Sequence, residues 1–219
     1  MLRALFVKTG QAIWISHLDL MRLFQRAFKR AGLALTHTQG YNPRPSVSIA
    51  LPLSVGVQSH CELLDFELEG EAIGCEEIKD RLNNALVEGV KVLEVYENGG
   101  KIKNLALLDC AVTLEYDQGI PDGAADAITS LFSREMLLVE KKGKNGIAEQ
   151  DIIPMIRSFG LSTPNDKTLA LNARICCQNP TLNPVQLSAA IAKYLPEYTP
   201  DFVSYCRVEI FNQDETIFR

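Results

Sequence analysis

The stretch SHLDLMRLFQRAFKRAG, residues 16–32, decides the fold of the first half of the chain. Ser16 precedes a run with apolar residues at helical spacing, and Asp19 follows three positions later, as in a capping box. Gly32 favours a helix end. At 100° per residue the apolar and the basic side chains fall on opposite faces. The apolar face holds Leu20, Phe24, Ala27 and Ala31, and the basic face holds Arg22, Arg26, Lys29 and Arg30. We therefore predict an amphipathic helix between Ser16 and Gly32.

Segments with strand-like patterns flank this helix. We predict strands at Leu2–Val7, Ser46–Leu51, Cys61–Leu68 and Val90–Tyr96. The helical spacing of Ile78, Leu82 and Leu86 predicts a second helix before the last of these strands. The order strand, helix, strand, strand, helix, strand is that of a ferredoxin-like α+β sandwich, in which both helices cover one face of an antiparallel sheet.

The second half follows a similar plan after Asn98-Gly99-Gly100. We predict strands at Leu107–Tyr116, Met136–Lys141, Thr168–Cys177 and Phe202–Phe211, and helices at Ala124–Phe132 and from Asn183-Pro184 to Tyr194. An extra short helix is expected near Ile152–Phe159, after a basic turn at Lys141–Gly146. The halves share no residue pattern, so the repeat is one of architecture. The chain is thus predicted to form two tandem ferredoxin-like sandwiches with antiparallel sheets. The first covers residues 1–98, and the second, with the extra helix, covers residues 104–219.

Composition and charge restrict the class of protein. At 219 residues and 47% hydrophobic content, the chain can bury a real core and should fold throughout. It has no run of eighteen apolar residues and no apolar signal core, so we expect a cytoplasmic protein without a membrane segment. The first fifty residues carry seven Lys or Arg and one acid, whereas the other 169 carry fifteen and twenty-six, giving about +6 and −11. This imbalance predicts that the N-terminal part binds something anionic.

The start of the basic helix is the first candidate site. Free backbone N–H groups and the helix dipole can bind phosphate or carboxylate there, and exposed arginines could add forked contacts. The candidate ligand-binding residues are Ser16, His17, Arg22, Arg26 and Arg30. The alternative is that Ser16 only caps the helix, His17 packs in the core and the arginines form a solvated face. Residue spacing alone does not decide between the two.

The loop after the helix is the second candidate site. It reads Gly40-Tyr41-Asn42-Pro43-Arg44-Pro45. An aromatic side chain beside Asn and Arg suits base stacking and contact with an RNA backbone, which makes Tyr41, Asn42 and Arg44 candidate ligand-binding residues. The same residue types also suit a rigid turn, and the two roles are compatible. We expect this loop and the basic helix face to form one exposed pocket for a negatively charged group.

Other site chemistry finds little support. The six cysteines include no CxxC pair, so buried reduced thiols are favoured over disulfides, zinc or an iron–sulfur cluster. His60 and Glu62 share a strand face while Asp65 points away, so no metal site is predicted. Asp65, Glu67 and Glu69 alternate with apolar residues, as on an exposed sheet face. The motifs GxGxxG, GxxxxGK[ST], GxSxG and HExxH are absent, and we predict no cofactor.

Several motifs in the first seventy residues occur together in a recognisable order. They are Phe6-x-Lys8-x-Gly10, Trp14-Ile15-Ser16-His17-Leu18-Asp19-Leu20-Met21-Arg22, Gln25-Arg26-Ala27-Phe28-Lys29-Arg30-Ala31-Gly32-Leu33, the Gly40 to Pro45 run, and Ala50-Leu51-Pro52-Leu53-x-Val55-Gly56-x-x-Ser59-x-x-Glu62. This string resembles a bacterial radical-SAM-linked protein family of unknown function, densely over about residues 2–70 and loosely afterwards. The resemblance implies a radical SAM protein as partner, because family members are encoded beside such proteins or fused behind them. The chain lacks the CxxxCxxC cluster motif, so the resemblance makes it the companion and not the radical SAM enzyme.

Three functions remain open at this point. We favour a non-catalytic accessory protein that binds structured or single-stranded RNA through the basic helix and the loop, and presents it to a radical SAM partner. The second is an enzyme that acts on an RNA or phosphorylated substrate with His17, Arg22 and Arg26. The third is a protein–protein adapter whose basic face meets an acidic partner. RNA binding would be recognised by its steep weakening with salt.

Overall fold

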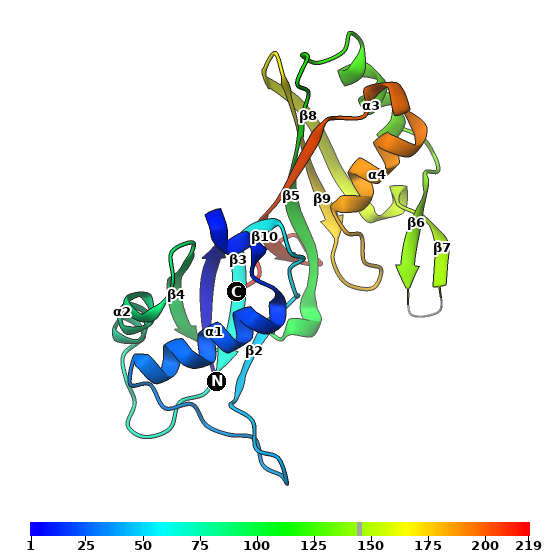
Figure 1. The fold of residues 1–219 in the computed structure, drawn as a ribbon. Coiled ribbons are helices and arrows are strands. Elements are labelled where there is room, and N and C mark those ends of the chain that lie inside the picture. The colour runs from blue at the N-terminus through cyan, green and yellow to red at the C-terminus, as the bar shows by residue number, and fades with distance from the viewer. Residues whose placement is uncertain (144–145) are drawn as a thin grey trace. The chain divides into compact units, whose positions relative to one another are not determined.

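The computed structural model describes residues 1–143 and 146–219, and its chain forms two compact units. The first unit contains Met1–Ile102 together with Arg219, and the second contains Lys103–Phe218. Both units combine helices with antiparallel sheets, so the protein has an α+β fold (Figure 1). No described helix combines the length and the apolarity needed to cross a membrane.

The first unit has the predicted order of elements. Its strands are β1 (Leu2–Lys8), β2 (Val47–Ala50), β3 (Val57–Phe66) and β4 (Val90–Glu97), and its helices are α1 (His17–Arg30) and α2 (Cys75–Ala85). A short 3-10 helix, η1 (Gly10–Trp14), lies between β1 and α1. The strands pair in the order β4–β1–β3–β2, and every neighbour is antiparallel. β1 and β2 therefore run in the same direction with β3 between them.

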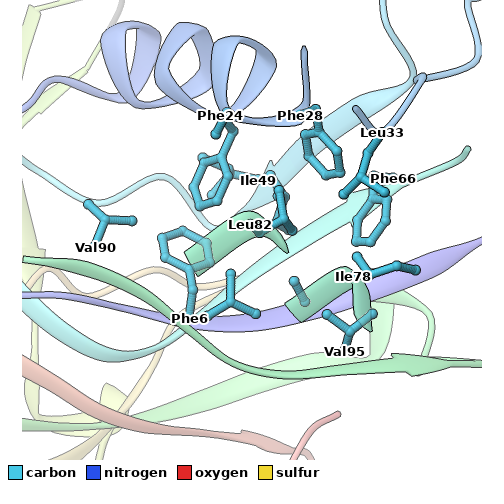
Figure 2. Packing of buried hydrophobic residues seen from close by; sticks show 14 of the residues in the cluster. Phe6, Phe24, Phe28, Leu33, Ile49, Phe66, Ile78, Leu82, Val90 and Val95 are labelled. Carbon is cyan, nitrogen blue, oxygen red and sulfur yellow. The ribbon is translucent and has the colours of Figure 1, made fainter. Parts of the chain in front are cut away.

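Both helices of the first unit pack on one apolar cluster. Phe24 of α1 meets Phe6 of β1 with ring centroids 4.8 Å apart, and Phe28 meets Phe66 of β3 at 4.9 Å. Leu82 of α2 lies in the same cluster and is fully buried (Figure 2). Because α1 and α2 contribute to one core, they cover the same face of the sheet. Edge-on and tilted ring pairs of this kind add to the stabilisation that burial provides.

The ends of α1 follow from its sequence. The Ser16 hydroxyl accepts a hydrogen bond from the backbone N–H of Asp19 at 3.2 Å and donates one to the Asp19 carboxylate at 2.7 Å. At the other end Gly32 adopts φ +68°, a conformation that glycine reaches without the steric cost that a side chain imposes. The predicted amphipathic helix is confirmed, because Leu20, Phe24 and Ala27 are buried.

The second unit contains a four-stranded sheet, two helices and a separate hairpin. The sheet order is β10 (Phe202–Asn212), β5 (Leu105–Glu115), β9 (Thr168–Cys176) and β8 (Ile156–Asn165), with all neighbours antiparallel. The hairpin pairs β6 (Leu138–Gly143) with β7 (Gly146–Asp151). The helices α3 (Ala124–Phe132) and α4 (Val185–Tyr194) lie on the same side of the sheet (Figure 1). Short 3-10 helices are η2 (Ile102–Asn104), η3 (Ile153–Met155) and η4 (Pro196–Tyr198).

The extra short helix predicted near Ile152–Phe159 is wrong. Only the three residues of η3 are helical, and β8 begins at Ile156 and pairs with β9. Ile152, which precedes this single turn, and Met155 within it are both buried. β8 is an edge strand in which only Ile156, Phe159 and Leu161 are half-buried, and a bulge between Ile156 and Ser158 interrupts the alternation by which strands are recognised.

The strand predicted at Met136–Lys141 takes part in a different pairing. It overlaps β6, which pairs with β7 in the hairpin and not with the strands of the main sheet. The predicted basic turn at Lys141–Gly146 includes residues 144 and 145, which lie outside the described part of the chain.

A buried ion pair replaces part of the predicted solvated acidic face. Arg3 donates from Nε to Asp65 Oδ1 at 2.5 Å and from Nη2 to Oδ2 at 3.0 Å, and both residues are buried. Arg3 Nη1 also donates to the carbonyl of Gly100, whose N–H bonds to the carbonyl of Arg219 at 2.6 Å. The prediction of exposure is therefore wrong for Asp65, while Glu67 is exposed. The alternation of polar and apolar residues along β3 gives no information about a basic partner for Asp65 on the neighbouring strand β1.

Candidate functional site

A groove in the first unit is lined mainly by residues of α1. Arg22, Arg26 and Arg30 line it at four-residue spacing, so successive guanidinium groups lie one turn apart along the helix. Its volume is about 470 Å³. The remaining lining residues are Ile15, Asp19, Leu23 and Val87, and all belong to the first unit. We call this feature the arginine groove.

The three arginines of the groove differ in how they are held. Arg22 Nη1 lies 3.0 Å from Asp19 Oδ1, and both side chains are more than half exposed. Arg30 Nη2 donates to the carbonyl of Ala85 at the end of α2, at 2.5 Å. Arg26 makes no hydrogen bond or ion pair with any described residue and is exposed. The groove thus holds three cations against one carboxylate, and Arg26 is the cation most available to a ligand.

Asp19 is the acidic member of the groove. The hydrogen bond from the Ser16 hydroxyl, followed by that from Arg22, lowers the pKa of Asp19 below its usual value. Its carboxylate therefore stays ionised at neutral pH and reduces the positive charge around Arg22. Because the pair with Arg22 is exposed, a stronger anion can compete for that guanidinium.

Ser16 and His17 do not line the arginine groove as the structure describes it. The Ser16 hydroxyl makes both of its hydrogen bonds with Asp19. Ser16 therefore caps the helix, which is the alternative to ligand binding that the sequence left open. His17 is partly buried, and its Nδ1 atom is enclosed without a hydrogen-bond partner among the described residues. Of the five candidates on the helix, the groove brings together Arg22, Arg26 and Arg30.

The loop with Tyr41, Asn42 and Arg44 is the second candidate site. The Thr38 N–H bonds to the Arg44 carbonyl at 2.8 Å, and the Arg44 N–H bonds to Thr38 Oγ1 at 3.1 Å. These bonds close the loop at its base, and it projects from the body of the first unit between α1 and β2 (Figure 1). Tyr41 is fully exposed at its tip. The described lining of the groove includes none of the tip residues Tyr41, Asn42 and Arg44, so one pocket shared by the helix face and the loop stays a prediction.

Three exposed apolar side chains belong to segments around the start of α1. Trp14 of η1 is 64% exposed, Leu18 of α1 is 67% exposed and Val55, before β3, is 52% exposed. The Trp14 ring lies against Gly56, where an added methyl group would come within 3.4 Å of a ring carbon. We call Trp14, Leu18 and Val55 the tryptophan patch. Sequence reasoning assigned it no role, although an apolar residue such as Leu18 beside Arg22 on a polar helix face is a usable signal.

A buried lysine holds η1 in place. Lys8 is 1% exposed, and its Nζ donates to the carbonyl of Ile13 at 3.0 Å. Burial lowers the pKa of Lys8, and the charge of buried Glu62 acts in the opposite direction. The lysine therefore supports the turn that presents Trp14, and it is not accessible to a ligand.

The thiols and the acidic residues offer no alternative centre. None of the six cysteines forms a disulfide in the described part of the chain, and Cys61, Cys110, Cys176 and Cys177 are buried. Burial raises the pKa of the Cys110 and Cys177 thiols to about 12. Within residues 1–143 and 146–219, no group of three or more His, Cys, Asp or Glu side chains is placed to hold a metal ion.

Comparison with known proteins gives a family without an assigned activity. A family model described as "Uncharacterized protein conserved in bacteria (DUF2344)" matches residues 1–184. No curated protein matches the chain. A solved structure described as an unknown protein from Galdieria sulphuraria aligns with 94% of this chain and 97% of its own, at 11% identity and a TM-score of 0.27. A TM-score this low does not establish a shared fold.

Proposed function

The chain belongs to this uncharacterized bacterial family, and from that premise we propose that it is an accessory protein that binds RNA through the arginine groove. We further propose, from the sequence resemblance, that it works with a radical SAM protein in the cytoplasm. Two tandem ferredoxin-like sandwiches are part of the same proposal. The strand orders β4–β1–β3–β2 and β10–β5–β9–β8, each with two helices, support that description of the fold.

The observation that carries the proposal is the row of Arg22, Arg26 and Arg30. Guanidinium groups bind phosphate oxygens through two parallel hydrogen bonds, and a row of them can follow consecutive phosphates. Leu23 and Val87 add apolar surface to the groove, against which bases or sugars can pack. An extended polyanion such as an RNA strand suits this arrangement better than a single small anion, because the charges are spread over two helical turns.

The tryptophan patch supports the second part of the proposal, the protein partner. Tryptophan and arginine are the residue types most enriched among those that dominate binding energy at protein interfaces. Leu18 and Arg22 lie one helical turn apart, so the patch continues into the arginine groove. A partner seated on the patch would therefore lie next to RNA held in the groove. The patch equally favours an adapter that meets an acidic partner without nucleic acid, and the experiment must separate the two.

RNA binding by the full chain is the direct test. Binding of a labelled single-stranded RNA can be measured by fluorescence anisotropy. We expect the RNA to bind, and we expect the logarithm of the binding constant to fall linearly with the logarithm of the salt concentration. The Arg26→Ala variant should weaken binding about tenfold and reduce the salt slope by about one, because one phosphate contact is lost. An RNA hairpin measured in parallel separates single-stranded from structured ligands.

Lys91→Ala is the matched control for this test. Lys91 is an exposed cation of the same unit that lies outside the groove lining, so its removal changes the net charge equally. Equal losses in the two variants would mean that only overall charge matters, and the groove would then not be the binding site. If no RNA binds at low salt while a protein complex forms, the adapter function replaces this proposal.

A further inference from the structure

The second unit contains a polar pocket that shares no lining residue with the arginine groove. It has a volume of about 570 Å³ and forms where β5 and β8 begin and where β9 and β10 end. Its walls include the Gln178–Pro180 loop and the turn after Asn212. A volume of this size is in the range of small-molecule binding sites.

Two cations at the pocket are available to a ligand. Lys103 and Arg157 are exposed and form no hydrogen bond or ion pair with any described residue. The one carboxylate in the lining, Asp214, is already bonded to the hydroxyl of Thr216 at 2.6 Å and to its N–H at 3.2 Å. The described lining therefore holds two positive charges against one negative charge, which leaves its net charge positive. Such a site favours an anionic group, and a guanidinium beside an ammonium suits phosphate.

Amide side chains make up much of the remaining lining. Five of the thirteen lining residues are Asn or Gln. The amides of Asn104, Asn179 and Gln213 make no hydrogen bond with any described residue, whereas Asn212 donates to Thr216 Oγ1 at 3.0 Å. Each of the three offers one carbonyl acceptor and two N–H donors. Asn and Gln pair with the edges of nucleobases through this combination of donor and acceptor.

The apolar part of the pocket provides surface for a flat ring. Leu105 and Leu107 belong to the lining but are almost fully buried, so the exposed ring of Pro180 is the apolar surface that a base can reach. A ligand that uses all three parts must combine an anionic group, a polar edge with several donors and acceptors, and an apolar face. We propose that this pocket binds a nucleoside phosphate, with the phosphate at Lys103 and Arg157 and the base edge at the amides. The inference is independent of the arginine groove and adds a second site to the molecule.

Calorimetric titration of the full chain with each of the four common ribonucleoside 5′-monophosphates tests this site. We expect at least one of them to bind with a dissociation constant of about 1 mM or lower. Arg157→Ala should weaken that binding about tenfold, and the corresponding uncharged nucleoside should bind about tenfold more weakly to the native chain, because both changes remove the same phosphate contact. Gln213→Ala should change the preference among the four bases.

Arg134→Ala is the matched control. Arg134 is an exposed arginine of the same unit whose guanidinium lies 5.5 Å from the Tyr194 ring centroid, outside the pocket lining. Its loss should leave nucleotide binding unchanged, and so should Arg26→Ala in the first unit. Because Arg26→Ala tests the groove alone, failure of the RNA proposal and failure of this one are distinguishable.

A second ligand distinguishes binding of a free nucleotide from binding of a nucleotide unit within an RNA strand. If a single-stranded oligoribonucleotide binds in an Arg157-dependent manner and the monophosphates do not, the pocket takes a nucleotide unit within a strand. Three outcomes would overturn the proposal: neither ligand binds, inorganic phosphate binds as tightly as the monophosphates, or Arg157→Ala and Arg134→Ala behave alike.

Discussion

Asp19 contributes both to the stability of the start of α1 and to the charge of the helix surface. Its carboxylate accepts hydrogen bonds from the Ser16 hydroxyl and from Arg22, so one residue completes the helix cap and compensates one of three arginines. Arg26 and Arg30 lie further along the helix and make no bond to it. The three arginines of the groove therefore differ in their bonds to other described residues, and Arg26 has the fewest.

The pKa of Asp19 should report this arrangement. The bond from Ser16 and then that from Arg22 lower the pKa in the folded protein, so the stabilisation they give is present above the ordinary aspartate pKa near 3.8. It is lost as the pH falls through the lowered folded-state pKa. An NMR titration of the side-chain carboxyl should give a pKa below 3.8 in the native chain and a higher one in Ser16→Ala. A value unchanged by that substitution would contradict the cap.

Gly89 joins two elements of the first unit through its backbone. Its carbonyl accepts the Thr9 N–H at 2.8 Å, which fixes the start of β4 against the chain that leads into η1. Gly89 has φ +83°, and an added Cβ would lie 2.4 Å from the Thr9 carbonyl oxygen. No side chain fits this position without a shift of the backbone.

Gly89→Ala should destabilise the protein by about 2–4 kcal/mol, because a clash with backbone is added to the cost of a left-handed conformation. Chemical denaturation curves measure this loss. Gly70→Ala is the matched control, since Gly70 has φ +90° but no atom within 4 Å of the added Cβ. Its cost should be about 1 kcal/mol from conformation alone. Equal losses in the two variants would refute the backbone contact.

The elements that the sequence predicted correctly carry a strong local signal. α1 combines a capping residue, a glycine end and a long apolar face, and the structure confirms it. β8 carries a weaker signal, because a bulge interrupts the spacing of its apolar residues Ile156, Phe159 and Leu161, and its other residues are exposed. β6 was recognised as a strand, but its partner was not, since pairing depends on contacts that sequence spacing does not encode.

The same limit applies to the candidate site. The row of Arg22, Arg26 and Arg30 follows from helical geometry alone, so it could be read from the sequence. The outward direction of the Tyr41 loop depends on its backbone ties between Thr38 and Arg44, which residue types do not reveal. The pocket of the second unit draws on strand ends and loops far apart in the chain, and no sequence window contains it.

The reactivity of the cysteine thiols reports on the packing of both units. Cys61 is buried in the first unit, and Cys110, Cys176 and Cys177 are buried in the second, while Cys75 and Cys206 are partly exposed. At a pKa of about 12, only about one Cys110 or Cys177 thiol in ten thousand is ionised at pH 8. A thiol-reactive dye should therefore label at most two sites in the native chain and six after denaturation. Rapid labelling of four or more native thiols would contradict the packing described here.

Trp14 is the chain's only tryptophan, and its place on the open surface gives the molecule a built-in optical probe. All indole emission of the unlabelled protein comes from this single point beside the arginine groove. A protein that binds over Trp14 should shift the indole emission to shorter wavelengths and protect the indole from a dissolved quencher. The lining of the pocket in the second unit contains no tryptophan, so a shift in this emission reports on the tryptophan patch.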